Sequence, residues 1–577
     1  MYNFVIFVVN IGHILLRRSS LLLLFVMGET ITAGALPHRQ DQTPASLKLI
    51  VVVVVDQMRS DYLTRFSDLY TGGFHRLLEN GANFPNTAYP YSGTYTGPGH
   101  AAILSGMLPA TTGIVSNSWF MPSLNRSVGC VEDTTVSLVG GKPEEGHSSP
   151  KNFFGASFAD EFKRGYENSK VISLSIKDRA AILPAGKNPD GTYWFNAATG
   201  RFGTSTYYRS SLPSWVTSFN NKQLPSSYLG KTWKKMLPEK AYVRSGKDSA
   251  RGEGFIPGER ASVFPHSVVD GKLISGGTTA RFEPLLYTPF GNDLTIAFAE
   301  TAIDSEMLGR QDFPDMLIVS FSSPDYVGHT FGPESHEIED MMLQLDRQLD
   351  GFMKFLDTRM GLQNTLIALT ADHGTSPLPE QHAAEGARRI SSKKILDDLR
   401  TTTAQRFGYD EKKENIILAY ANDYIYVDTV RLARQIKPAI TASAFADTVA
   451  AHLLTRTEVS RCFTREQLSA SIAAGGTGND SIQSRVEKSF NAQRSGSVAV
   501  VLKPYCFLTN DATGSTHGSP YWYDRQVPLL FSGYGIKSGT YTGAATPLDL
   551  VPTLAKILGG VSVPTGCAGT PLLDAIQ

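Results

Sequence analysis

The sequence predicts an α/β fold in which helices flank a mainly parallel central sheet. Three observations support this prediction. Continuous apolar runs rich in β-branched residues recur along the chain, as they do in strands that are buried on both faces. Stretches whose apolar residues recur every three or four positions lie between these runs, which indicates amphipathic helices. Strands that alternate with helices in this way are typical of a parallel sheet.

The first predicted strand lies within LKLIVVVVVDQM, residues 47–58, and Asp56 stands at its end. Four more runs of the same kind follow it, at residues 170–176, 315–325, 365–374 and 526–533. The helical pattern is clear at residues 336–357 and 548–559. A chain of 577 residues is long enough to bury a large core around such a sheet.

Two stretches interrupt the alternation of strands and helices. Residues 190–285 are rich in Gly, Ser, Tyr and Pro, and residues 379–510 mix helical and polar patterns. We expect one catalytic domain over residues 46–577, in which both stretches are insertions that cover the carboxyl edge of the sheet.

The first 35 residues have the composition of a targeting segment. A basic pair at Arg17 and Arg18 precedes the apolar run LLLLFVM, and Ala33-Gly34-Ala35 ends the segment. This order is typical of an export signal peptide, and the apolar residues upstream leave an N-terminal membrane anchor as the alternative. No later run approaches the ~18 apolar residues of a membrane-spanning helix. We therefore expect an exported protein, either periplasmic or extracellular.

Charge and cysteine content argue against several classes of protein. Lys+Arg and Asp+Glu both number 54, so no charge excess points to nucleic acid or to an anionic membrane surface. No two cysteines have the C-x-x-C spacing of a thiolate zinc site, and one or two disulfides remain open with undetermined pairing. The four cysteines are Cys130, Cys462, Cys506 and Cys567.

Acidic and imidazole side chains gather at the ends of the predicted strands. Because ligands of open α/β sheets collect outside the carboxyl ends of the strands, residues far apart in the chain can converge there. Each of them alone has a plainer reading, as a turn former or as a hydrogen-bonded structural histidine. Together they are suited to zinc, which accepts imidazole nitrogen and carboxylate oxygen. The six residues are Asp56, Asp325, His329, Asp372, His373 and His517.

These six residues divide into two candidate metal sites. Asp325, His329 and His517 would make a three-ligand site with an open position, as a catalytic zinc requires. The other three would make a second site, whose remaining place a threonine oxygen could fill.

The segment TYTGPGHAAILSG, residues 94–106, places two threonines where a helix is expected to begin. Backbone N–H groups without intrahelical partners and the positive end of the helix dipole make such a position suitable for binding an anion. Thr is also an ordinary N-cap residue, so helix capping is the alternative reading of this segment.

Taken in order, the motifs T-x-x-G-H, D-x-x-x-H, D-H-G and a late H-G resemble those of the alkaline phosphatase superfamily. The resemblance covers nearly the whole chain after residue 45. It implies that Thr96 is the nucleophile and a ligand of the second metal ion, and that two Zn²⁺ ions are bound, with other divalent ions possible. Thr94 matches nothing in the family pattern, and His100 is expected to support the start of the helix.

Two further segments indicate which group within the superfamily the chain resembles. Asn117 lies 21 residues after Thr96. Lys177 and Arg179 stand two positions apart, which predicts that both lie on one face of an extended segment. Together the three residues resemble those of the threonine-nucleophile, phosphate-irrepressible alkaline phosphatases, in which such side chains hold the phosphoryl oxygens. A solvated basic loop is the plainer reading of the Lys and Arg pair.

The resemblance implies a metal-dependent hydrolase of small-molecule phosphate monoesters that acts through a phosphothreonine intermediate. We expect a monomer with no nucleic-acid-binding surface. A phosphodiesterase or nucleotide pyrophosphatase on the same scaffold is the alternative, and it would lack the Lys and Arg pair. A sulfatase needs a C/S-x-P-x-R motif, which residues 92–104 lack. A secreted binding protein that keeps its metals only for stability is the alternative from another class.

Overall fold

The computed structural model describes residues 46–274, 279–436 and 440–577. The predicted signal peptide or anchor, residues 1–35, lies outside these ranges. Within the described ranges, no helix combines the length and the apolar character that crossing a bilayer requires.

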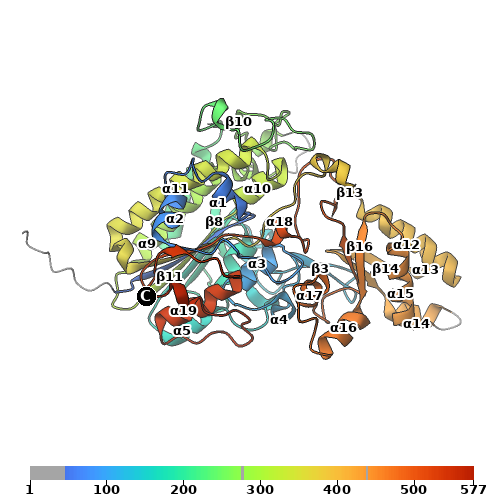
Figure 1. Ribbon diagram of the computed structural model, residues 1–577. Helices are drawn as coiled ribbons and strands as arrows, with labels where there is room; N and C mark the ends of the chain where they lie inside the picture. Colours follow the sequence, from blue (N-terminus) through green and yellow to red (C-terminus); the bar gives the residue numbers. More distant parts are fainter. Residues whose placement is uncertain (1–45, 275–278, 437–439) are drawn as a thin grey trace, which may run out of the picture. The chain divides into compact units, whose positions relative to one another are not determined.

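Ten strands of the described chain form one central sheet (Figure 1). The five strands at its middle run parallel to one another, and antiparallel pairs follow on both sides. The prediction of a mainly parallel sheet is confirmed, and all five predicted strands are present. In spatial order the strands are β20 (Gly539–Thr540), β2 (Ala82–Asn83), β19 (Leu529–Gly533), β12 (Thr365–Thr370), β1 (Leu49–Val55), β11 (Asp315–Phe321), β6 (Val171–Ser175), β7 (Gly191–Asn196), β8 (Arg201–Ser205) and β5 (Leu138–Val139).

The central strand β1 is buried on both faces, which explains its unbroken apolar sequence LIVVVVV. Successive side chains point to opposite faces, so Val51 and Val53 belong to one hydrophobic core and Val52 and Val54 to another. Helices cover both faces of the sheet (Figure 1). Against the first core lie α2 (Gly73–Asn80), α9 (Phe290–Glu306), α10 (Ser323–Phe331) and α11 (His336–Met360). Against the second lie α3 (Thr96–Ile103), α5 (Phe158–Gly165) and α19 (Leu550–Leu558).

The carboxyl ends of the parallel strands bring the predicted site residues to one edge of the sheet. Asp56 follows β1 directly, and Asp372 and His373 follow β12. Asp325 does not end a strand as predicted, because β11 stops at Phe321 and Asp325 lies in the first turn of α10. The loop that precedes the antiparallel strand β19 reaches the same edge from the opposite direction, through α18 (Trp522–Arg525).

The first insertion begins later than predicted. Strands β7 and β8 pair within the central sheet, so residues 191–205 belong to the sheet and the boundary at 190 is wrong. Their Gly, Ser and Tyr content resembles that of a loop, although β7 is largely buried. The described remainder of the stretch contacts α10 and α11. Gly254 N donates a hydrogen bond of 2.7 Å to the main-chain oxygen of Thr330 in α10, and Trp233 Nε1 donates one of 2.6 Å to Asp340 in α11.

The second insertion, residues 379–510, carries a four-stranded sheet and a hydrophobic core of its own (Figure 1). The strands are β14 (Ile417–Ala421), β15 (Tyr424–Val427), β17 (Val498–Leu502) and β16 (Val459–Thr464). The helices α12 (Ser392–Phe407), α15 (Ala442–Leu453) and α16 (Arg465–Ala473) accompany this sheet.

The four cysteines all lie in the described part of the chain, and all four are unpaired. Neither of the disulfides that the sequence left open is formed.

Helix α3 approaches the end of β12 so closely that position 99 has room only for glycine. A Cβ atom on Gly99 would lie 2.2 Å from the main-chain oxygen of Asp372 and 2.7 Å from its Cβ. Real Cβ atoms do not approach other heavy atoms this closely. The glycine therefore allows the helix that begins at Thr96 to pack directly against Asp372.

We expect Gly99→Ala to lower the free energy of unfolding by about 1 to 3 kcal/mol, because the methyl group overpacks a backbone that cannot move without shifting Asp372. Gly351→Ala is the matched control. It lies in α11, and nothing is within 4 Å of the added Cβ, so a gain of about 0.5 to 1 kcal/mol is expected from helix propensity. Urea unfolding of both variants measures the difference, and equal effects would contradict the close approach.

Candidate active site

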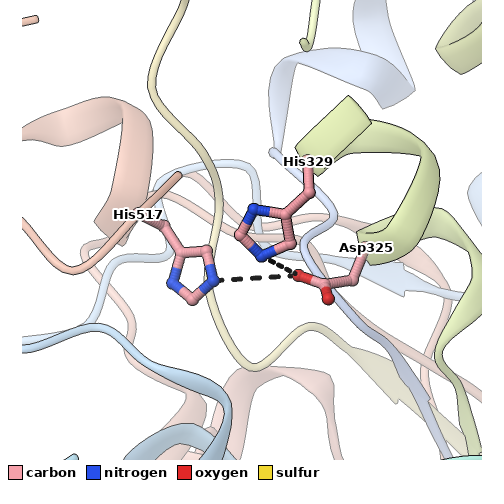
Figure 2. Close-up of side chains that lie close together, drawn as sticks. All are labelled: Asp325, His329 and His517. Atoms are coloured by element: carbon pink, nitrogen blue, oxygen red, sulfur yellow. Dashed lines mark ion pairs between the residues drawn. The ribbon is translucent and has the colours of Figure 1, made fainter. Parts of the chain in front are cut away.

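The first candidate metal site consists of Asp325, His329 and His517 (Figure 2). Asp325 and His329 lie one turn apart on α10, which places both on one face of the helix. The Oδ1 atom of Asp325 is 3.2 Å from His329 Nε2 and 3.7 Å from His517 Nε2. The three ligand atoms therefore face a common point, as the sequence predicted.

The second candidate site consists of Asp56, Asp372 and His373, which are completely buried. His373 Nε2 lies 3.5 Å from Asp56 Oδ1 and 3.4 Å from Asp372 Oδ2. The hydroxyl oxygen of Thr96 lies 3.3 Å from the same nitrogen. Thr96 thus adds an oxygen to this set of three, at the first position of α3.

The histidines of both sites are oriented for metal binding. His329, His373 and His517 each donate the Nδ1 hydrogen to a main-chain carbonyl oxygen, at 2.8 to 2.9 Å. In the neutral form of each ring, this bond leaves the lone pair on Nε2, the nitrogen that faces the carboxylates. Burial, followed by repulsion from the other two histidines, holds the pKa of His517 well below its ordinary range, so its imidazole is neutral.

His100 has no nitrogen left for a metal ion. Its Nδ1 lies 3.0 Å from the carbonyl oxygen of Thr96 and 3.1 Å from Asp372 Oδ2, and its Nε2 lies 2.8 Å from the hydroxyl of Ser320. Both ring nitrogens therefore have partners, and His100 supports the start of α3, as the sequence predicted.

Three buried carboxylates share this edge of the sheet. Burial, followed by repulsion from Asp325 and Asp372, raises the pKa of Asp56 well above its ordinary range. Burial acts on Asp325 in the same direction, but attraction to His329 and Lys177 outweighs it and holds its pKa well below the ordinary range. The Oδ1 atom of Asp56 is buried and has no hydrogen-bond partner among the described residues. This concentration of negative charge and unpaired acceptors fits divalent cations.

Lys177 joins the two sites. Its ammonium group lies 2.6 Å from Asp56 Oδ2 and also contacts Asp325 Oδ2. Burial opposes its charge, but attraction to Asp325 and Asp56 raises the pKa of Lys177 above its ordinary value. The lysine is therefore cationic throughout the alkaline range.

Asn117 and Arg179 also approach this region. The side-chain oxygen of Asn117 accepts a hydrogen bond of 2.7 Å from the N–H of Gly97. This contact fixes the orientation of the amide and leaves its NH₂ group free to donate. The Nε atom of Arg179 is buried and has no hydrogen-bond partner among the described residues. Both residues therefore offer donors that the described chain does not use.

The prediction that Lys177 and Arg179 lie on an extended segment is wrong. Lys177 is the N-cap of α6 (Asp178–Ala185), and Arg179 lies in its first turn. The helix begins here because β6 ends at Ser175 and Asp178 provides an acidic side chain in the first turn. The pair is thus carried by a helix N-terminus, where the dipole adds to its positive charge.

Gln57 is a site residue that the sequence did not reveal. Its backbone N–H donates to Asp372 Oδ1 at 3.1 Å, and its side-chain amide donates to Asp325 Oδ1 at 2.7 Å. It therefore connects the two candidate sites. Its backbone is left-handed, with φ of 66°, and a non-glycine residue in this conformation two positions after a buried strand has no sequence signature.

Comparison with known proteins identifies relatives over most of the chain. The family model for type I phosphodiesterase / nucleotide pyrophosphatase matches residues 50–522. Alkaline phosphatase PafA of Elizabethkingia meningoseptica is 34% identical over 559 residues, which are 96% of this chain and 98% of the relative. Alkaline phosphatase PhoV of Synechococcus elongatus is 36% identical over 543 residues, 93% of this chain and 94% of the relative.

A crystal structure of wild-type alkaline phosphatase PafA has the same fold, with a TM-score of 0.85 and 35% sequence identity. The match covers 93% of this chain and 100% of that one. A solved variant of alkaline phosphatase PafA, in which a threonine, an asparagine, a lysine and an arginine are substituted, matches with a TM-score of 0.84.

The raised pKa of Asp56 leads to a prediction about the chelator-treated protein. A carboxyl whose folded pKa is raised contributes stability below its unfolded pKa of about 3.9, and this contribution is lost as the pH rises through the folded value. At pH 8, far above the unfolded value, the raised pKa of Asp56 therefore destabilises the chelator-treated protein. We expect Asp56→Asn to raise its Tm by about 2 °C at pH 8.

The same substitution should have little effect at pH 4, where Asp56 is already neutral in the folded chain. Thermal unfolding by circular dichroism at both pH values measures the difference. A lower Tm for Asp56→Asn at pH 8 would contradict the repulsion among the three carboxylates.

Proposed function

The chain belongs to the type I phosphodiesterase / nucleotide pyrophosphatase family, and within it we propose that the chain is an alkaline phosphatase, a metal-dependent hydrolase of small phosphate monoesters. The observation that carries the proposal is the position of Thr96. Its hydroxyl stands at the N-terminus of α3, 3.3 Å from His373 Nε2 of the second candidate metal site. The relatives named alkaline phosphatase, at 34% and 36% identity over nearly their full length, support the same activity.

The solved variant of alkaline phosphatase PafA supports the choice of site residues. Its substituted threonine and asparagine have the spacing of Thr96 and Asn117, and its substituted lysine and arginine have the spacing of Lys177 and Arg179. We therefore assign the phosphoryl-binding role to Asn117, Lys177 and Arg179 of this chain.

The donor sets support two zinc ions, one held by Asp325, His329 and His517 and the other by Asp56, Asp372, His373 and Thr96. Neutral imidazole and carboxylate are ligands that zinc prefers, and other divalent ions also accept them. When bound, the ions supply Lewis acidity at the attacking and leaving oxygens and lower the pKa of the hydroxyl beside them.

Thr96 performs the nucleophilic step. Its Oγ1 loses a proton to solvent and attacks phosphorus. The bond between phosphorus and the oxygen of the leaving group breaks, and the leaving group departs as an alkoxide that takes up a proton from solvent. The phosphothreonine that results is hydrolysed by water, which releases phosphate and restores the hydroxyl. The N-terminus of α3 favours the negative charge at each stage.

Asn117, Lys177 and Arg179 explain a preference for monoesters. A monoester dianion carries one more negative charge than a diester, and this charge is spread over the oxygens that do not react. The free NH₂ group of Asn117 and the unpaired Nε of Arg179 can donate to these oxygens. Lys177 adds a full positive charge nearby.

The alternative is a phosphodiesterase or nucleotide pyrophosphatase, an activity for which the family is also named. A second ester group would occupy an oxygen that Lys177, Arg179 or Asn117 could otherwise contact. These three residues therefore favour the monoesterase. We further propose that the enzyme is exported, on the basis of the basic pair and the apolar run in its first 35 residues.

Thr96→Ala should abolish phosphothreonine formation and lower kcat/KM for p-nitrophenyl phosphate by about three orders of magnitude or more. Thr94→Ala is the matched control. Its hydroxyl donates only to the Ser519 carbonyl at 3.1 Å, and its own carbonyl, which anchors His517, survives the change. We expect a loss of about 1 kcal/mol in stability and little change in rate. Mass spectrometry of quenched enzyme detects the intermediate, and an inactive Thr94→Ala variant beside an active Thr96→Ala would overturn the assignment.

Replacing both Lys177 and Arg179 with Ala should harm monoesters far more than diesters. We expect a loss of about two to four decades in kcat/KM for p-nitrophenyl phosphate, because each charge-assisted contact contributes about 2 to 3 kcal/mol and the two are not additive. The rate with bis-p-nitrophenyl phosphate should change much less. The ratio of the two specificity constants cancels any loss of folded protein, and an unchanged ratio would favour the diesterase.

A further inference from the structure

The turn between β14 and β15 extends from the second insertion to the start of α3 and the start of β3 (Ser118–Met121). Asn422 and Asp423 form the turn, and both have a left-handed backbone, with φ of 48° and 64°. Two-residue hairpin turns favour Asn, Asp and Gly in this conformation. Hairpin geometry therefore explains the backbone of the turn. It does not explain where the two side chains are bound.

The carboxylate of Asp423 holds the residue that precedes the proposed nucleophile. Tyr95 donates its hydroxyl hydrogen to Asp423 Oδ2 at 3.0 Å, and Tyr95 is the N-cap residue of α3. The ring of Tyr95 also lies 5.7 Å from the ring of His517, between centroids. This contact therefore acts on the backbone that presents Thr96.

The amide of Asn422 holds the residue that follows Asn117. Its Nδ2 donates a hydrogen bond to the main-chain oxygen of Ser118, at the start of β3 (Ser118–Met121). Asn117 in turn accepts from the N–H of Gly97, the residue after Thr96. The side chains of Asp423 and Asn422 thus bind the neighbours of Thr96 and Asn117, respectively.

The turn is fixed within its own sheet. Val500 N donates to the main-chain oxygen of Asp423 at 2.7 Å, and β17 pairs with β15 beside the turn. The insertion behind it has a hydrophobic core of its own. A rigid sheet holds a side chain more accurately than a free loop does. Burial raises the pKa of Asp423 to about 6, so at alkaline pH its carboxylate accepts from Tyr95 as a charged group.

We propose that Asn422 and Asp423 are positioning residues that hold Asn117 and Thr96 in the arrangement required for phosphoryl transfer. The second insertion then supports catalysis directly, in addition to covering the sheet. The inference rests on the proposed phosphatase function, because it assigns a role relative to the proposed nucleophile.

The test removes each side chain without straining the turn. Asn422→Gly and Asp423→Gly keep a residue that adopts positive φ freely, and Tyr95→Phe removes only the hydroxyl partner of Asp423. We expect each variant to lower kcat/KM for p-nitrophenyl phosphate about tenfold, with zinc content unchanged, because a small displacement of the reacting groups is costly. The double variant of Tyr95→Phe and Asp423→Gly should lose no more than either single variant, because both remove one contact.

Two further variants separate positioning from stability. Asp423→Asn retains an acceptor oxygen for Tyr95 and should restore kcat/KM to within about threefold of the unmodified enzyme. Asp428→Ala removes the N-cap of α14 (Thr429–Gln435) at the other end of β15. It weakens the same insertion without touching the turn, so its kcat/KM should remain within about twofold.

The inference is overturned if the two glycine variants keep the kcat/KM of the unmodified enzyme within twofold. It is also overturned if the losses of Tyr95→Phe and Asp423→Gly multiply, or if Asp428→Ala causes an equal loss. The phosphatase proposal fails separately, if the unmodified enzyme does not hydrolyse monoesters or if Thr96→Ala retains activity.

Discussion

The structure depends on the concentration of three buried carboxylates at one edge of the sheet. Asp56, Asp325 and Asp372 come from the ends of neighbouring parallel strands and from the helix that follows one of them. Their mutual repulsion is opposed within the described chain by Lys177 and by histidines. This arrangement lowers the stability of the fold and creates a site that attracts cations. Catalytic sites commonly have this combination of properties. The proposed chemistry follows from this electrostatic constraint.

The layers around the sheet serve that site in different ways. The parallel strands fix where the carboxylates stand, and main-chain carbonyls fix how the histidines face them. Gly99 lets α3 pack against Asp372 and thereby brings the hydroxyl of Thr96 beside His373. The second insertion contacts Tyr95 and Ser118, the neighbours of Thr96 and Asn117 in the sequence. Residues far apart in the sequence thus converge because each is held by a different rigid element.

The parts of this account that could be predicted from the sequence are those with a strong local pattern. The run around Val52 predicted a strand buried on both faces, and its terminal aspartate was one of the residues that predicted the site at the carboxyl edge. The sequence identified Lys177 and Arg179 as site residues but did not predict that they lie at the start of a helix, because a two-residue spacing fits both a strand and a helix start. The boundary at 190 failed because strands that contain Gly, Ser and Tyr, such as β7 and β8, resemble loops in sequence. The roles of Gln57 and Asp423 could not be predicted from the sequence, because they depend on contacts with residues that lie hundreds of positions away in the chain.

The central claim is that the buried carboxylates and imidazoles form two cation sites, and metal stoichiometry tests it most directly. The chelator-treated enzyme is titrated with zinc while bound metal is measured by mass spectrometry and p-nitrophenyl phosphate hydrolysis is followed in parallel. The account predicts two zinc ions per chain, with full activity only when both are bound, and one ion fewer in His517→Ala. Full activity in the metal-free enzyme would contradict it.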